Sequence, residues 1–523
     1  MIYQFADYSL DVERQELRRG TELVDVEPQV LDLLQYLIRN RERVVSKDDL
    51  IEHVWHGRIV SESTLTSRIT AARQAIGDSG DQQRLIRTIA RKGIRFVGEV
   101  RDDKSSPTGD GATNTMPPSP GVTVRRLPDK PSIAVLPFTN ISGDTEQEYF
   151  ADGITEDIIT DLSKIAGLLV IARNSSFTYK GKNADIRTIG RELGVRSVLE
   201  GSVRRASNRV RITAQLVNAE NGAHLWAERY DRDLTDIFAV QDDVTRSIVD
   251  ALKIKLTPGE AARVADIPTN SIEAHDLFLR GRELMFGRKW NREIFDKVVS
   301  LMTRAIELDP NYAEPYAGLG MAHNNDFHNH LTGSPDAIDV AEHFATLAIE
   351  KGPTVPIAHW IAGTVAIWKK DLERGKRETE AALALNPNYA LAYGTRGNAE
   401  LYSGHPFAAI PFYERAIHLD PAYAHQYLHF VGSSYLVAGK YEMAVDSFRE
   451  RIRLAPETDL SRGLLVSALG HLGEVDEARR IWAELKKINP KYSFAGHLAR
   501  LPFSNPADAD RIKGGFAKAG LSE

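Results

Sequence analysis

The chain has 523 residues, 42% hydrophobic and 26% charged, which is typical of a globular protein with several domains. It contains no cysteine, and this excludes disulfides, thiolate metal sites and cysteine nucleophiles. The formal net charge is −6, so any nucleic-acid site has to be a local basic patch. No apolar stretch approaches the roughly 18 residues of a membrane helix, and the first residues carry acids where a signal segment is apolar. We therefore expect a cytoplasmic protein without membrane contact.

Residues 1–100 alternate between strand-like and helical segments. The hydrophobic spacing predicts short antiparallel strands, three helices and a terminal hairpin at, in order, 1–25, 28–38, 46–54, 62–76 and 85–97. Ser46 and Asp49 form a capping-box pattern at the start of the second helix. This order of elements predicts an α+β winged helix-turn-helix domain.

The residues resemble the OmpR/PhoB-type DNA-binding domain over nearly all of positions 1–100. The resemblance is carried by Val54-Trp55, by SESTLTSRITAARQAI at 61–76 and by IRTIARKGIRF at 86–96. One departure is Ile94, where the family usually has tyrosine. The resemblance implies that the third helix and the wing bind double-stranded DNA, with two copies on tandem half-sites as a homodimer.

The charge pattern supports a DNA interface independently. Between positions 58 and 98 there are eight Lys/Arg and three acids, inside a chain that is acidic as a whole. A charge run alone is more often a solvated face, so the fold pattern carries much of the inference. We expect contacts to bases and phosphates from Ser63, Thr66, Ser67, Arg68, Thr70 and Gln74 of the third helix and from Arg91, Lys92 and Arg95 of the hairpin.

Three further residues near this surface have two interpretations, a phosphate contact or a scaffold role: Trp55, Arg73 and Arg87. Trp55 is expected to be mostly packed. For Arg73 the scaffold alternative is an ion pair with an acid of the second helix, Asp49 or Glu52.

Residues 101–127 are rich in Pro, Ser, Thr, Gly and Asp, and they predict a flexible linker between the N-terminal domain and the rest of the chain. No receiver domain precedes the winged helix in the sequence, so we expect no phosphorylated aspartate of the response-regulator kind.

Residues 128–257 show an α/β pattern. Strands are expected at 131–138, 168–172, 197–203, 209–217 and 223–231, and helices at 147–165, 185–193 and 237–256. Through KPSIAVLPF, YFADGITEDIITDLS and HLWAERYDR the segment resembles the TolB-like, or FlgO-like, domain. Such domains are often found before tetratricopeptide (TPR) arrays and behind exchangeable output domains, which implies a regulatory or sensing role.

The middle domain contains two groups of polar residues that are candidates for a site. Four carboxylates share one predicted helix, and a metal or acid–base role is weighed against a solvated polar face with the first acid at the cap or in the first turn: Asp152, Glu156, Asp157 and Asp161. Arg173, Asn174 and Ser175 follow a strand, where α/β ligands bind. No phosphate-binding loop, nucleophile elbow or zinc-protease motif occurs, so we expect no catalytic residue, no metal and no cofactor.

The C-terminal half is repetitive. Prolines end helix-like runs at Pro310, Pro353, Pro387, Pro421, Pro456 and Pro490, with spacings of 43, 34, 34, 35 and 34 residues. This period resembles the TPR, so 270–500 is expected to form an all-α superhelix that binds a protein or peptide partner, with 501–523 as a tail. Turns between paired helices are expected at Gly404, Gly439 and Gly473, and small–aromatic packing at Gly397 and Tyr413.

The first long repeat carries nine extra residues with a group of possible metal ligands, which we interpret as a polar, irregular loop: His323, Asp326, His328 and His330. The whole sequence predicts a DNA-binding transcriptional regulator that is not an enzyme, with a TolB-like/TPR sensing body. The alternative is a TPR scaffold or signalling adaptor whose winged helix mediates protein contacts.

Overall fold

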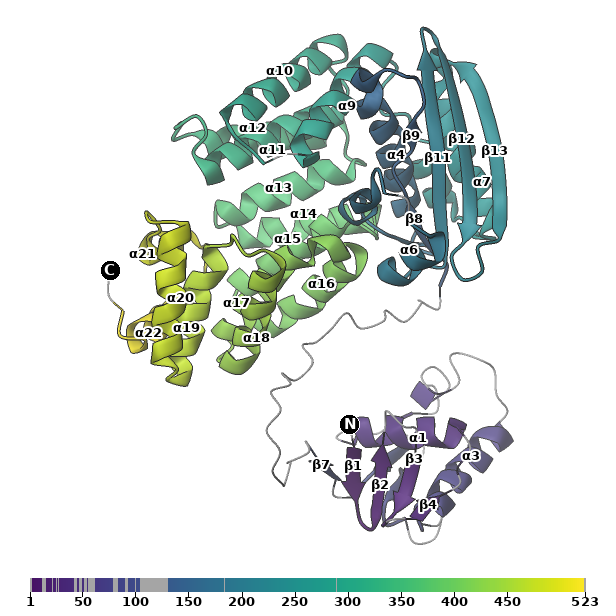
Figure 1. Ribbon diagram of the computed structural model, residues 1–523, viewed down its shortest axis with the longest axis vertical. Coiled ribbons are helices and arrows are strands. Elements are labelled where there is room, and N and C mark those ends of the chain that lie inside the picture. Colours follow the sequence, from purple (N-terminus) through teal and green to yellow (C-terminus); the bar gives the residue numbers. More distant parts are fainter. Residues whose placement is uncertain are drawn as a thin grey trace. The chain divides into compact units, whose positions relative to one another are not determined.

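The computed structural model (Figure 1) describes residues 130–521 apart from 183 and 288, and residues 2–103 with gaps at 12–15, 21, 25, 27, 42–44, 47–48, 51–53, 55–61, 79–82, 90–92 and 99. Some further side chains within the N-terminal elements, Ser63 and Thr66 among them, lie outside the description. The chain divides into two compact units, Met1–Ser119 and Pro120–Glu523.

The first unit packs a sheet, two described helices and a hairpin around one core. Its antiparallel sheet has the order β4-β3-β2-β1-β7, with strands β1 (Ile2–Phe5), β2 (Tyr8–Asp11), β3 (Glu16–Arg19), β4 (Glu22–Val24) and β7 (Val100–Asp103). The remaining elements are α1 (Pro28–Arg39), α3 (Glu62–Ala75), β5 (Ile86–Ile89) and β6 (Gly93–Phe96). Phe5 of the sheet and Phe96 of the hairpin meet edge to face at 5.3 Å. The core thus joins sheet, helices and hairpin.

The end of β7 differs from the expected N-terminal domain, whereas the capping box at Ser46 agrees with it. Residues 101–103, which we expected in the linker, form the end of β7 and pair with β1. The capping box is present, because Ser46 Oγ accepts a hydrogen bond from the Asp49 backbone at 3.0 Å and Asp49 accepts one from the Ser46 backbone at 2.8 Å. The rest of the expected linker, 104–127, lies outside the described residues.

The second unit begins with a three-layer α/β domain. Its sheet has the order β10-β8-β11-β12-β13, and the short β9 (Thr139–Asn140) pairs with β11. The strands are β8 (Ser132–Val135), β10 (Leu169–Val170), β11 (Ser197–Ala206), β12 (Arg209–Asn218) and β13 (His224–Asp233). Helices α4 (Glu148–Ser163) and α7 (Ile237–Ala251) bury apolar stripes on one face, and α6 (Ile186–Leu193) packs on the other. The expected α/β pattern is confirmed, although α7 ends at Ala251, before position 256.

A helical array follows through the connecting helix α8 (Pro258–Val264). Its helices form antiparallel pairs that stack along the chain (Figure 1): α9 (Ile272–Gly287), α10 (Arg292–Leu308), α11 (Ala313–Asn329), α12 (Ala337–Lys351), α13 (Pro356–Trp368), α14 (Leu372–Leu385), α15 (Ala390–Tyr402), α16 (Pro406–Leu419), α17 (Ala424–Val437), α18 (Tyr441–Leu454), α19 (Leu460–Leu472), α20 (Val475–Ile488), α21 (Phe494–Arg500) and α22 (Pro506–Lys518). The expected TPR superhelix is confirmed. The residues expected as a tail contain α22, which packs closely on α19.

The glycine positions explain the helix pairing. Gly404, Gly439 and Gly473 have φ angles of +86°, +74° and +78°, a left-handed conformation that reverses the chain between paired helices. At Gly397 an added Cβ atom would lie 2.5 Å from the fully buried ring of Tyr413. The small–aromatic pairing expected from the repeat is therefore a close contact between α15 and α16.

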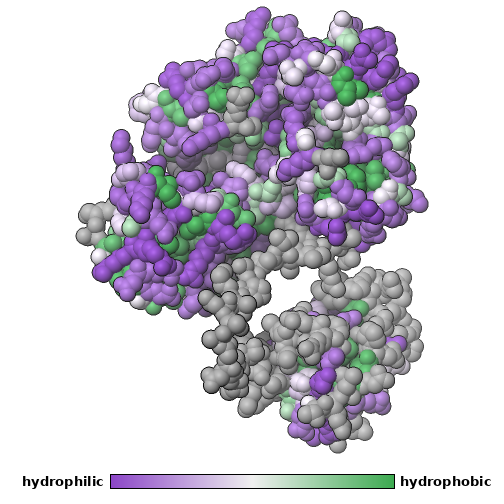
Figure 2. Space-filling model, in the orientation of Figure 1, coloured by the Kyte–Doolittle hydropathy of each residue, from purple (hydrophilic) through white to green (hydrophobic). Residues whose placement is uncertain are grey.

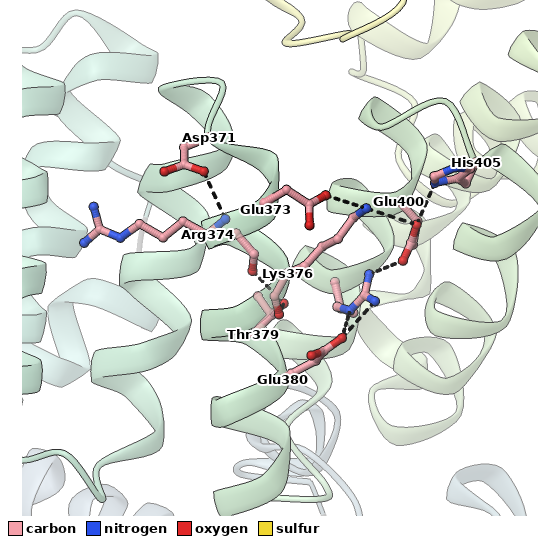
Figure 3. A network of polar contacts seen from close by, with 10 residues as sticks. Asp371, Glu373, Arg374, Lys376, Thr379, Glu380, Glu400 and His405 are labelled. Atoms are coloured by element: carbon pink, nitrogen blue, oxygen red, sulfur yellow. Dashed lines mark hydrogen bonds and ion pairs between the residues drawn. The ribbon is translucent and has the colours of Figure 1, made fainter.

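Charged side chains form ion pairs between neighbouring repeats, next to this helix packing. In the network of Figure 3, Arg396 of α15 binds Glu380 of α14 at 3.0 Å and also pairs with Glu400. His405 approaches Glu400 at 3.1 Å. Burial opposes ionisation of Glu400, but these partners hold its pKa below the usual value. On the face in Figure 2, hydrophobic residues of this unit are scattered among hydrophilic ones, as expected when the apolar faces are buried between elements.

The interpretation of the extended repeat as a loop is wrong. Helix α11 continues to Asn329, so it carries three of the four residues assigned to that loop, and His330 ends it with a left-handed φ of 52°. His323 lies between the rings of Phe295 and Phe344. Asp326 accepts a hydrogen bond from the Thr332 backbone at 2.7 Å. The helical spacing of the apolar residues outweighed the polar composition.

Replacing Gly397 tests the α15–α16 contact. We expect Gly397→Val to lower the free energy of unfolding by about 1–3 kcal/mol, because the new side chain enters a filled space beside Tyr413. Gly167→Val is the matched control, since the Cβ added there would meet only one atom, at 3.8 Å. Urea unfolding measures both variants, and an equal effect of the two substitutions would contradict the close contact.

A buried histidine predicts acid sensitivity at the end of the array. His497 is 5% exposed, and burial followed by the charge of Arg500 lowers its pKa to about 4. Because the folded state prefers the neutral ring, its contribution to stability is complete above pH 6.5 and is lost as the pH falls towards 4. Between pH 8 and pH 5 this one group costs about 2 kcal/mol. His497→Gln should flatten the pH dependence of unfolding by that amount, and an unchanged dependence would contradict the assignment.

Candidate nucleic-acid interface and interdomain cavity

Helix α3 presents a polar face to solvent. Ser67, Thr70 and Gln74 are exposed at helical spacing, whereas Ala72 and Ile76 are buried in the core. Arg68 is half-buried beside this face. Short polar side chains on an exposed helix are suited to reach base edges in a major groove. Ser63 and Thr66 also lie on α3, but their side chains lie outside the described residues.

The guanidinium of Arg73 connects α3 with the hairpin. The residue is only 8% exposed, and it donates to the Ile86 carbonyl at 3.2 Å and to Thr88 Oγ1 at 2.8 Å. The scaffold alternative named an ion pair with Asp49 or Glu52; the hydrogen bonds of Arg73 run to β5, and Glu52 lies outside the described residues. This buried guanidinium connects α3 to the hairpin, which is a scaffold role.

Asp78 is a second positioning residue, and the sequence analysis counted it only as an acid. It is 5% exposed and accepts hydrogen bonds from the backbone of Arg84, Leu85 and Ile86, each at 2.9 Å. The carboxylate therefore holds the backbone at the start of β5 next to the end of α3. An aspartate directly after the glycine that ends a helix was the signal in the sequence.

The hairpin carries a basic face. Arg87 of β5 and Arg95 of β6 are register partners, so their side chains leave the same face of the hairpin, opposite the buried Ile94 and Phe96. Ile94 exchanges two backbone hydrogen bonds with Val45. The isoleucine that stands here in place of the family's usual tyrosine is thus accommodated in the core. Arg91, Lys92 and Trp55 lie outside the described residues.

In the α/β domain the four carboxylates of α4 form ion pairs. Asp152 binds Lys180 at 2.6 Å, and Asp161 binds Lys164 at 2.8 Å. Burial raises the pKa of Asp161 to about 6. The interpretation as a solvated face is wrong for this helix, because α4 packs against the TPR array, and Asp152 lies in the second turn, beyond the cap and first turn expected for it.

Two of these carboxylates bind residues of the first TPR helix. Asp157 accepts from Arg282 at 2.8 Å, and Glu156 lies 3.3 Å from the same guanidinium and 2.9 Å from that of Arg173. His275 also contacts Asp157, with its Nε2 atom 3.3 Å from the carboxylate oxygen. Burial opposes the charge of Asp157, yet Arg282 and His275 lower its pKa to about 2. These acids hold the two domains together.

The residues after strand β10 bind a turn between two repeats. Asn174 donates to Asp420 at 2.9 Å, and Ser175 Oγ donates to the same carboxylate at 2.6 Å. Ser175 also accepts from the Ala422 backbone. The group expected as a ligand site is therefore largely engaged in an interdomain contact. Arg173 and Asn174 also line a cavity, where Arg173 is paired with Glu156 and Asn174 with Asp420.

A second inter-repeat turn makes the same kind of contact. The Asn388 amide donates to the carbonyls of Ser163, Ile165 and Leu168 at 3.0–3.3 Å, and its oxygen accepts from the Val170 backbone. The residue is 3% exposed. One asparagine thus satisfies the buried polar groups between α4 and β10.

A cavity of about 620 Å³ lies between the α/β domain and the array. Its walls are α4, the start of α7, the end of α8, helix α9 and the turns that precede α11, α13 and α15. Aromatic side chains from both domains line it: Phe238, Phe278, Phe286, Tyr312 and Tyr389. Its size and its mixed wall are typical of a small-molecule site. Within the described ranges, no group of three or more metal-ligating side chains is arranged to hold an ion.

Comparisons with known families agree with this organisation. Residues 20–96 match the family "Transcriptional regulatory protein, C terminal", and residues 129–247 match "HilA/YgeH-like transcriptional regulator, second domain". The N-terminal unit accordingly holds an OmpR/PhoB-type winged-helix DNA-binding domain, and a HilA-like regulator domain follows it.

Among individual proteins, "Putative adenylate cyclase 3" of Rhizobium meliloti (strain 1021) is 52% identical over 252 residues, 48% of this chain and 43% of that protein. "Transcriptional regulator HilA" of Salmonella typhi is 22% identical over 368 residues, 69% of this chain and 60% of that protein. The chain thus spans about half the length of these curated relatives. The TPR protein YrrB aligns with 38% of this chain and 98% of its own, at 20% identity and a TM-score of 0.28. None of the helices in the described part of the chain has both the length and the apolar character that a membrane crossing needs.

Asn388 provides a test of the interdomain contact. We expect Asn388→Ala to lower the free energy of unfolding by about 2–4 kcal/mol, because it leaves several buried backbone groups unpaired. Hydrogen exchange should rise at 163–170. Asn329→Ala removes one exposed amide bond and serves as the control. Unchanged exchange at 163–170 in Asn388→Ala would show that the contact is dispensable.

Proposed function

We propose that this chain is a DNA-binding transcriptional regulator whose TolB-like/TPR body receives a signal and controls its output. The single observation that carries the proposal is a solvent-facing polar and basic surface on the winged helix of a DNA-binding family. It consists of the exposed polar face of α3 and the cross-strand neighbours Arg87 and Arg95 of the hairpin. Local positive charge on an acidic chain favours duplex DNA as its target. The cytoplasm, where the DNA lies, is its proposed site of action.

The proposal also covers what the body does. We propose that it is not an enzyme, since the carboxylates of α4 are occupied by ion pairs that join the domains. The stacked repeats offer a surface for a protein or peptide partner. Two copies are proposed to bind tandem half-sites. The scaffold or adaptor alternative requires the winged helix to bind protein in place of DNA.

The salt dependence of DNA binding tests the proposal. The double variant Arg91→Ala with Lys92→Ala should weaken binding of the full chain to duplex DNA, and it should reduce the slope of log K against log salt by about 2, since each lost phosphate contact accounts for roughly 0.9. Lys297→Ala with Arg304→Ala removes the same charge from the exposed surface of α10 and should leave the slope unchanged.

Fluorescence anisotropy across a salt series measures both variants. Equal slopes in the two double variants would contradict DNA contact by the wing, and absence of DNA binding by the unaltered chain at low salt would favour the adaptor.

A further inference from the structure

The interdomain cavity is lined by a partly buried carboxylate, that of Glu314, which takes no part in the ion pairs of the described residues. Glu314 stands in the first turn of α11 and lines the cavity. Its Oε2 atom is buried, yet among the described residues it has no hydrogen-bond partner. A buried acceptor without a donor is costly, so a site that retains one is arranged for a donor that arrives with a ligand.

The neighbouring cations are already engaged elsewhere. Lys164 binds Asp161 at 2.8 Å and the Arg263 carbonyl at 2.9 Å. Arg282 bonds with Asp157 at 2.8 Å and with the Gly153 carbonyl at 2.9 Å. The guanidinium groups of Arg173 and Arg282 also both contact Glu156. Within the part of the chain that the structure describes, Glu314 forms no ion pair with either cation.

Burial also makes the ionised form of Glu314 unfavourable as long as no positive charge binds it. It raises the pKa of this carboxyl to about 7, and nearby Asp157 adds to the effect, while Lys164 and Arg282 oppose it. A ligand that brings a positive charge would restore the ionised form, and it would gain a charge-assisted hydrogen bond inside a shielded cavity.

The rest of the wall fits an apolar or aromatic body. Phe278 is buried in the core, while Phe238, Phe286 and Tyr389 are partly exposed beside the cavity. Ile267 lines it while remaining 56% exposed. Aromatic faces beside a carboxylate are the usual environment in which proteins bind organic ammonium groups.

We propose that the cavity binds a small amphipathic organic cation, whose ammonium group pairs with Glu314 and whose apolar body packs on the aromatic wall. The inference gives a chemical class to the signal in the proposed function, and only its regulatory use rests on that function. Because the ligand would contact both α4 and the start of α11, its binding would stabilise one arrangement of the two domains.

Three probes of equal chain length test the charge requirement on the full-length protein: hexylammonium, hexanol and hexanoate. Isothermal titration should show saturable binding of hexylammonium near one per chain, with much weaker binding of the neutral and anionic probes. Glu314→Gln should weaken hexylammonium binding at least tenfold and leave hexanol binding unchanged. Glu442→Gln alters another first-turn glutamate, on α18 and outside the cavity, and is the matched control.

A second variant covers the case in which Glu314→Gln fails to fold. Leu391→Trp adds volume at the cavity wall and should abolish binding of all three probes. Tighter binding of hexanoate than of hexylammonium, no saturable hexylammonium binding, or equal affinity in Glu314→Gln would each overturn the proposal. These titrations contain no DNA, so their failure is distinct from failure of the DNA-binding proposal.

Discussion

The second unit depends on polar side chains in the turns between repeats. Asn388 and Asp420 each stand beside a repeat-ending proline, and each binds groups of the α/β domain. The turns of an array recur at a fixed rise, so they form a row, and the α/β domain is bonded to two members of that row. The apolar core runs through the same junction from the sheet into the array. The α/β domain and the repeat array are therefore one packed body, in which a change at one part is opposed by contacts at the other.

The junction gives α4 a role that differs from that of an ordinary surface helix. Its apolar stripe covers the sheet, and its acids reach Arg282 and His275 of the array. At Gly153 an added Cβ would lie 2.7 Å from the Leu279 side chain, so a larger residue on α4 would have to displace this buried side chain of α9. Apolar packing and buried ion pairs act together here, and removal of one charged partner would leave the other buried and uncompensated.

Local patterns predicted most elements of the fold, because proline spacing, helical periodicity and strand alternation are properties of short segments. Gly404 and Gly439 could be assigned to turns for the same reason. The partners of Glu156, Arg73 and Asn388 could not be predicted, since each bond joins elements whose meeting depends on the tertiary fold. Charged residues on α4 look alike in sequence whether they face water or a second domain. The cavity could not be predicted either, because its wall combines residues from elements that are far apart in the sequence.

The most direct test of the central claim, that this chain is a sequence-specific DNA-binding regulator, is selection of random duplex DNA by the purified full-length chain at low and at physiological salt. The account predicts enrichment of one motif, because α3 carries an exposed polar face and the hairpin a basic one, and tandem repetition of that motif if two copies bind as proposed. The absence of any enriched sequence, even at low salt where phosphate contacts are strongest, would contradict it.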